Sequence, residues 1–199
     1  MQGPQNLGYL HPPIDRQGIG SGIRMTAPLS LLFSNGLEKL KQGDLHGAEA
    51  LFRQAHRAFP DDPVALFLLG MVRLNSSDFI QAEAFFRRAL AISPNQPKVC
   101  IQLAHALRRQ LRPVEAIAFC KITIAAEPDN IDAHLELAKA LDESDHFAEA
   151  ESAYRHILDR KAEPLASLGL GAMLNRMGRS EDAEKILRRA LDPDSHNEG

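Results

Sequence analysis

The side chains best suited to catalysis or metal binding in this chain are its eight histidines and two cysteines. The histidines do not recur at spacings that would gather them, and His46 and His56 stand too far apart on one expected helix to share an ion. The chain also lacks the HExxH zinc motif, the Walker A phosphate loop, the nucleophile elbow and the CxxC pair. We therefore predict that the protein is not an enzyme and has no catalytic, cofactor-binding or metal-binding residues.

Positive charges recur along the chain at an interval of 34 residues, with one interval of 33, and such a stripe could bind nucleic acid. The five cations are Arg53, Arg87, Lys121, Arg155 and Arg188. Four of them follow a glutamate by four residues, the orientation that favours an ion pair on a helix: Glu49, Glu83, Glu151 and Glu184. We therefore expect paired charges on a solvated face, and no nucleic-acid partner.

The interval of these charges is also the interval of the whole sequence, which predicts a repeat architecture. Five units fit residues 29–62, 63–96, 97–130, 131–163 and 164–197, and the fourth is one residue short. Each unit has a small residue at position 8, Ala at position 20 and, in most units, a large residue at position 24; three units have Pro at position 32. Position 8 is Gly36, Gly70, Ala104, Ala138 and Gly171, and position 24 is Phe52, Phe86, Cys120, Tyr154 and Leu187.

Each unit contains two segments with the apolar period of an α-helix, separated by turn residues such as NSSD at 75–78. Pro113 stands where the second helix of unit 3 should begin, a position that tolerates proline. No segment alternates polar and apolar residues as a strand does, so we predict an all-α chain. In an antiparallel hairpin, position 8 should face position 20, and position 4 should face position 24. A single hairpin cannot bury its outward apolar stripe, so the units should stack.

This pattern resembles the tetratricopeptide repeat (TPR), with its small residue at position 8, Ala at 20, aromatic residue at 24 and Pro at 32. The chain departs from the family by lacking Trp at position 4. The resemblance implies an α-solenoid, a right-handed superhelix of five TPR helical hairpins over residues 28–192. It also implies an adaptor or scaffold that binds a protein or peptide segment in a concave groove.

The groove implied by the resemblance is lined by positions 2, 5, 9, 12 and 13 of each first helix. These positions are apolar in units 1 and 2, basic in unit 3, where they include Arg108, and largely acidic in unit 4. We therefore expect a ligand with an apolar anchor beside acidic residues, although each apolar residue could instead pack adjacent hairpins. The predicted partner-binding residues are Phe33, Leu37, Phe67, Met71, Lys98, Ile101, His105, Arg109, Asp132, Lys139 and Arg176.

Cys100 and Cys120 occupy positions 4 and 24 of unit 3 and should face each other across a hairpin. Helix-to-helix spacing usually leaves such Cα atoms beyond the roughly 7 Å limit for a disulfide. We predict two buried, reduced thiols that fill the core, with a redox-sensitive pair as the alternative. Because position 24 is Phe in units 1 and 2, Cys120→Phe should be accepted.

Composition sets the expectations about location. Apolar residues make up 44% and charged residues 25% of the 199, and the net charge is −3. The longest apolar stretch, VALFLLGMV, is too short to span a bilayer, so we expect no membrane partner. Two cysteines do not make a disulfide framework and favour a reducing compartment, the cytoplasm.

The two ends of the chain differ from the repeats. Residues 1–27 are rich in Gly, Pro and Gln, so we expect a flexible tail, with Met25 as an alternative start, and residues 193–199 should form a C-terminal tail. No polar capping helix follows the last helix, so this end should self-associate or dock a further domain through Ile186, Leu187, Ala190 and Leu191. The alternative function is the N-terminal recruiting region of a longer enzyme, such as a TPR-fused glycosyl- or sulfotransferase.

Overall fold

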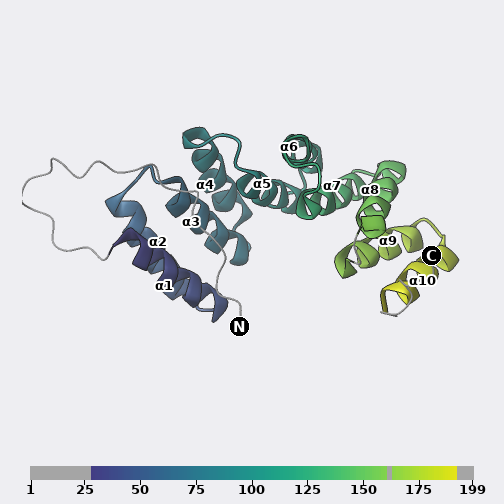
Figure 1. Cartoon of the computed structure of the whole chain (residues 1–199), viewed down its shortest axis with the longest axis horizontal. Coiled ribbons are helices and arrows are strands. Elements are labelled where there is room, and N and C mark those ends of the chain that lie inside the picture. The colour runs from purple at the N-terminus through teal and green to yellow at the C-terminus, as the bar shows by residue number, and fades with distance from the viewer. Residues whose placement is uncertain (1–27, 161–162, 192–199) are drawn as a thin grey trace, which may run out of the picture.

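The protein folds as a chain of helical hairpins. The computed structural model describes residues 28–160 and 163–191, and these form ten α-helices and no strand. The expected all-α solenoid is confirmed, and the first helix of each hairpin begins at the first residue of its unit. The helices (Figure 1) are α1 (Leu29–Lys41), α2 (Leu45–Ala58), α3 (Pro63–Asn75), α4 (Phe79–Ile92), α5 (Pro97–Arg109), α6 (Pro113–Ala126), α7 (Ile131–Glu143), α8 (Phe147–Arg160), α9 (Pro164–Arg176) and α10 (Ser180–Leu191). Both expected tails lie outside the described residues.

Capping side chains and prolines fix where the helices begin. In four helices an N-cap side chain accepts a hydrogen bond from the backbone N–H three residues further on: Asp44, Asp62, Asp78 and Asn130. Proline is the first residue of α3, α5, α6 and α9, where its missing N–H leaves no helical hydrogen bond unmade. Pro113 thus starts α6 as predicted.

Every hairpin turns through one residue in the left-handed region of backbone space. This residue is position 15 of each unit, with φ between 59° and 78°: Gly43, Ser77, Leu111, Asp145 and Gly178. Glycine adopts this conformation without steric cost, whereas leucine rarely does. Because all five turns share the conformation, the two helices of each unit meet in a similar way.

The core of the first two hairpins is built around the ring at position 24. The buried Phe86 ring lies directly against Gly70, and a Cβ added to Gly70 would lie 2.7 Å from Phe86 Cδ1. Phe52 lies against Gly36 in the same way, with Cζ 2.7 Å from an added Cβ. The small residue at position 8 is therefore needed for the ring at position 24. The expectation paired position 24 with position 4, and in these two units the ring at position 24 also lies against position 8.

The other hairpins balance the sizes at positions 8 and 24 differently. Unit 3 combines Ala104 with the smaller Cys120, and both are fully buried. In unit 5, a Cβ on Gly171 would lie 2.9 Å from Leu187 Cγ.

Unit 4 combines Ala138 with the buried ring of Tyr154, which lies instead against Gly169 at position 6 of unit 5, with Cζ 2.7 Å from an added Cβ. The corresponding position 6 after unit 3 is Glu136, so a ring at position 24 of unit 3 would meet neither glycine. We therefore expect Cys120→Phe to be destabilising, unlike the prediction made from position 24 alone.

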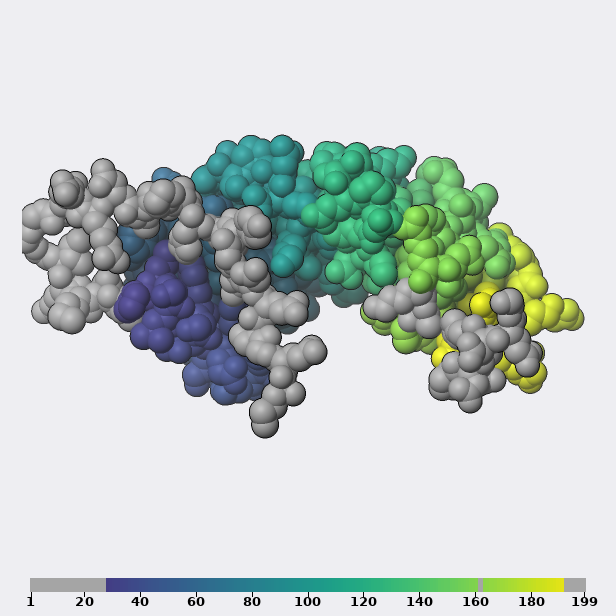
Figure 2. Space-filling view, viewed as in Figure 1, coloured from purple at the N-terminus to yellow at the C-terminus, as the bar shows by residue number. Residues whose placement is uncertain are grey.

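The hairpins stack into an arch whose inner side is formed by their first helices. Each helix packs against the next, and the first helices also contact one another, α3 with α5, α5 with α7 and α7 with α9. Figure 1 shows α5 and α7 on the inner side of the arch and α6 on its outer side. In the space-filling view the two ends of the array lie on the same side of its middle (Figure 2). The inner side is therefore the place where a long segment could contact several repeats at once.

Both cysteines belong to the core of unit 3. They are free thiols, and Cys100 is 5% and Cys120 0% exposed, so the prediction of two buried, reduced residues is confirmed. Burial raises the pKa of the Cys100 thiol, against a hydrogen bond with Thr123 that lowers it. Burial also raises the pKa of Cys120 to about 12. Since the thiolate is the nucleophile, neither residue is suited to redox chemistry in the folded state.

We expect both thiols to react with iodoacetamide at pH 7 at least about 100-fold more slowly in the folded protein than in urea, because the thiolate is nearly absent and shielded. Mass spectrometry of timed reactions measures both rates. Fast labelling of either cysteine under folding conditions would contradict the core assignment.

Candidate ligand-binding groove

The predicted groove would include the unburied face of α5. Apart from Pro97 at the start of this helix, the residues that are not buried follow one another at intervals of one to four: Lys98, Gln102, His105, Arg108 and Arg109. Residues three or four apart share one face of a helix, so these form a stripe. Because α5 lies on the inner side of the arch, this unburied stripe is the part of α5 that a ligand in the predicted groove could reach.

The apolar end of the groove lies on the first two hairpins. Phe33 and Leu37 of α1 and Phe67 and Met71 of α3 are all half-buried, and each packs partly against the buried core. Phe67 lies with its ring centroid 5.9 Å from that of Phe86. These four side chains therefore serve the packing of hairpins and still present apolar surface at the groove.

Ile101 differs from the other predicted groove residues. It is only 6% exposed, and Leu135 at the same position of the next unit is equally buried. Ile101 therefore belongs to the core between hairpins and presents little surface to a ligand. The first helices come closest together here, so position 5 is covered in units 3 and 4.

The basic part of the groove is weaker than its residue types indicate. Lys98 and Arg109 are exposed, and the Arg109 guanidinium carbon lies 5.0 Å from the centre of the Phe79 ring. Burial lowers the pKa of His105 more than nearby Glu136 raises it, so the imidazole is neutral at pH 7. Lys98 and Arg109 are thus the exposed cations of this part of the groove.

Arg108 is held in an ion-pair network between α5 and α7, which we call the α5–α7 network. The Arg108 Nε donates to Glu136 at 3.1 Å, and the Arg108 Nη1 pairs with Glu143. Lys139 Nζ also pairs with Glu136, at 2.9 Å. The Arg108 and Glu136 side chains are 11% and 10% exposed. Burial would raise the pKa of Glu136, but the Arg108 and Lys139 cations outweigh it and hold this pKa below its usual value. Arg108 therefore joins two repeats, whereas Lys139 pairs within its own helix and adds to the positive charge around Glu136.

Arg176 has a similar role between units 4 and 5. It pairs with Asp142 of α7, and its guanidinium carbon lies 5.9 Å from the centre of the Phe147 ring. Asp132, by contrast, is exposed at the first turn of α7. Among the predicted charged residues, Lys139 and Arg176 thus pair with carboxylates, whereas Lys98 and Asp132 lie exposed and Arg109 lies exposed over the Phe79 ring of unit 2.

Sequence reasoning missed one residue of the groove. Leu168 of α9 is 57% exposed, and Leu165 one turn earlier is 55% exposed. Leu168 holds position 5 of its unit, the position of Phe33 and Phe67, and this correspondence was the signal that could have found it. Exposed apolar surface therefore occurs at both ends of the groove, with charged side chains between.

The second helices carry the column of cations, and its expected ion pairs are confirmed. The distances are 2.7 Å for Arg53–Glu49, Arg87–Glu83 and Arg155–Glu151, and 2.6 Å for Arg188–Glu184. Three of these glutamates also bind an arginine of the next unit: Arg73, Arg112 and Arg179 respectively for Glu49, Glu83 and Glu151. Glutamates thus pair with four of the five cations of this column, and three of these glutamates also link adjacent repeats.

Two interfaces between hairpins use the same contacts at the same positions. Between units 2 and 3, Arg109 covers Phe79 and Arg112 binds Glu83 at 2.6 Å. Between units 4 and 5, Arg176 covers Phe147 and Arg179 binds Glu151 at 2.6 Å, at the equivalent four positions. The interface between units 3 and 4 has the α5–α7 network instead. The interfaces of units 2 with 3 and of units 4 with 5 are therefore alike, and the interface of units 3 with 4 differs from both.

The exposed apolar surface at the C-terminal end is smaller than expected. Ile186 and Leu187 of α10 are half-buried against α9 and the core, whereas Ala190 and Leu191 are exposed, Leu191 by 84%. Self-association through this end stays a prediction.

Residues 28–160 and 163–191 contain no group of three or more His, Cys, Asp or Glu side chains that could hold a metal ion. His134 stacks on His156 at 4.6 Å between ring centroids, and its Nε2 lies 2.8 Å from the Pro128 carbonyl oxygen. No helix in this part of the chain has the length and apolar character needed to cross a bilayer.

Stacked hairpins with close small-to-aromatic contacts and an inner groove define a helical-repeat protein. The chain belongs to the tetratricopeptide repeat family: two family profiles, both described as tetratricopeptide repeat, match residues 33–97 and 107–167. The resemblance drawn from positions 8, 20, 24 and 32 is thereby confirmed.

Solved structures of low sequence identity share this fold. MamA from Desulfovibrio magneticus RS-1, from residue 41 to its end, is 19% identical over 88% of this chain and 100% of that chain, with a TM-score of 0.74. A thermophilic TPR protein from Thermus thermophilus is 20% identical over 85% and 94%, with a TM-score of 0.71. YrrB, described as a TPR protein with an unusual peptide-binding site, is 17% identical over 83% and 87%, with a TM-score of 0.64. A comparison with curated protein sequences gives no match.

Proposed function

We propose that this protein is a non-catalytic interaction module that binds a polypeptide segment along its groove. The observation that carries the proposal is the row of half-buried apolar side chains on the inner side of the first two hairpins: Phe33, Leu37, Phe67 and Met71. Side chains of this kind are held in place by the core and need little ordering when a ligand binds, so they are suited to anchoring an apolar residue.

The charges nearby define the rest of the ligand. Arg108 is paired within the α5–α7 network, which leaves Lys98 and Arg109 as exposed cations next to the apolar end. We infer a ligand whose apolar anchor is followed by acidic residues. The anchor would supply most of the affinity, and the charges would set specificity and the rate of encounter.

Random displayed peptides of about ten residues, which extend over roughly 33 Å, provide a probe for this proposal. We expect selection on the folded protein to enrich peptides with an aromatic or aliphatic residue beside Asp or Glu. Lys98→Glu with Arg109→Glu should weaken the selected peptides at least about tenfold without loss of helix content, because neither side chain is buried. Fluorescence anisotropy measures the affinities, and circular dichroism measures the folding.

A matched control carries the same change of charge on the second helices, Lys121→Glu with Arg188→Glu, both exposed. This control should bind the peptides as the unchanged protein does. Equal loss in both variants would show that only net charge matters, and unchanged binding by the first variant would move the site away from the groove.

A further inference from the structure

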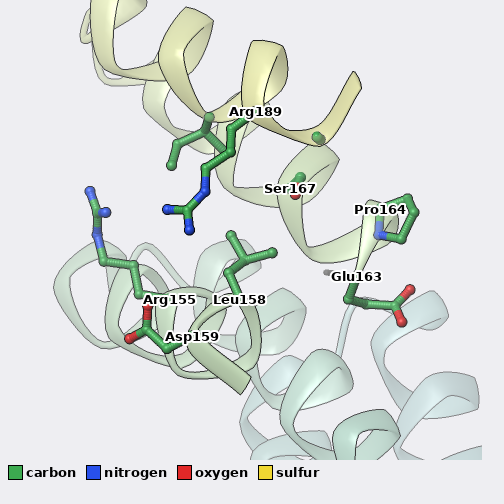
Figure 3. A pocket seen from close by; sticks show the side chains of 9 residues that line it. Arg155, Leu158, Asp159, Glu163, Pro164, Ser167 and Arg189 are labelled. Atoms are coloured by element: carbon green, nitrogen blue, oxygen red, sulfur yellow. The ribbon is translucent and has the colours of Figure 1, made fainter. Parts of the chain in front are cut away.

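A pocket of about 70 Å³ opens between the ends of α8 and α10 and the first turn of α9. In Figure 3 the Leu158 side chain points from α8 into the space between Arg189 of α10 and Ser167 of α9. This space is about five times what one buried water needs, roughly 10–15 Å³. The residues that line it are Arg155, Leu158, Asp159, Glu163, Pro164, Ser167, Ile186, Arg189 and Ala190.

The pocket coincides with a change at one repeat position. Ser167, which is 5% exposed, holds position 4 of unit 5, where units 1 and 2 have leucine. Those leucines, Leu32 and Leu66, are 4% and 0% exposed and fill the core of their hairpins. Cys100 and His134 hold the position in units 3 and 4. Position 4 therefore has its smallest side chain, a serine, in unit 5.

Two side chains that line the pocket hold repeat positions whose side chains touch each other between units 1 and 2. Leu158 and Ile186 hold positions 28 and 23 of consecutive units. At the same two positions between units 1 and 2, His56 and Phe85 meet edge to face, with ring centroids 6.5 Å apart. Unit 4 is also one residue shorter than the other units. The pocket therefore opens where smaller side chains stand at the positions that two rings fill between units 1 and 2.

We propose that this pocket binds one leucine-sized aliphatic side chain of a partner polypeptide. The occupant follows from the repeat itself, since a leucine side chain fills position 4 in two other hairpins. Leu158 and Ile186, both half-buried, provide apolar walls, Pro164 and Ala190 lie at the exposed edge, and charged side chains stand around the opening, the arrangement typical of a pocket at a protein interface. The pocket lies between α8, α10 and the first turn of α9, and its lining includes none of the residues predicted for the groove.

The test uses N-acetyl-leucine N-methylamide as probe and the NMR signals of the Ile186 and Leu158 methyl groups as readout. We expect saturable shifts at millimolar probe, and none with N-acetyl-glycine N-methylamide. Ser167→Leu should fill the pocket from within, weaken the probe at least about tenfold, and raise the Tm by about 2–4 °C. Ser167→Ala keeps the space and should keep the binding.

Two further variants make the outcome decisive. Ala190→Leu fills the pocket from α10 and should also prevent binding, which covers the case in which Ser167→Leu does not fold. Lys98→Glu with Arg109→Glu alters the groove alone and should bind the probe normally. Absence of shifts in the unchanged protein, or equal shifts in Ser167→Leu and Ala190→Leu, would overturn the proposal while leaving the groove proposal intact.

Discussion

Gly70→Ala is expected to destabilise the protein by about 1–3 kcal/mol, although alanine is the better helix former by about 1 kcal/mol. The added Cβ would lie 2.7 Å from Cδ1 of Phe86, whose ring is fully buried and has nowhere to move. Urea denaturation measures the change. An increase in stability would show that the ring can yield and that helix propensity decides the outcome.

The matched experiment is made in unit 3. Cys120→Phe alone should cost about 1–3 kcal/mol, because Ala104 occupies the place of the glycines that lie against Phe52 and Phe86. The route taken by the Tyr154 ring, against Gly169 of the next unit, is also closed, since the equivalent residue after unit 3 is Glu136. Adding Ala104→Gly should recover most of this loss, since it recreates the pairing of units 1 and 2. If both changes destabilise independently, the contact between positions 8 and 24 does not govern the hairpin.

Arg108→Met is expected to destabilise the protein by about 2–3 kcal/mol, because it leaves the nearly buried Glu136 with one cation fewer. Glu136→Leu in addition should restore much of the stability, since two apolar groups replace a desolvated ion pair. Thermal melting at pH 7 of both single variants and the double variant measures the coupling. Arg53→Met removes an exposed partner of Glu49 and should change stability by less than about 1 kcal/mol.

The same pair predicts a dependence on pH. The pKa of Glu136 is lowered in the folded protein, so its contribution is complete above the pKa of the unfolded chain and disappears as pH falls through the folded pKa. Below about pH 4 the unchanged protein should therefore lose more stability than the double variant. Parallel losses in both proteins would place the acid-sensitive carboxylates elsewhere.

The sequence was enough to predict the hairpins because their determinants are local. The period of the apolar residues, Pro113 and the turn residues all act within one helix or one turn, so the helix starts follow from spacing alone. The four ion pairs on the second helices were predictable for the same reason, since both partners lie on one helix four residues apart.

The contacts between units were not predictable in this way. Arg108 and Arg176 have the residue types of a charged groove, but each reaches a carboxylate of the neighbouring repeat through the stacking of helices, as the structure alone reveals. Ile101 is covered for the same reason, because the arch brings the first helices together at the middle of the array. Periodicity assigns residues to a face of one helix, whereas the curvature decides how much of this face remains open.

The likeness of these two interfaces restricts which hairpins can be removed. Removing residues 97–130, one hairpin, would place Glu143 beside the Phe79 ring in the position that Arg109 now holds. Removing residues 97–163, two hairpins, would place Arg176 there and recreate the present cation–ring contact. Units 3 and 4 can therefore leave the array together with this contact kept, whereas the loss of unit 3 alone would set a carboxylate against the ring.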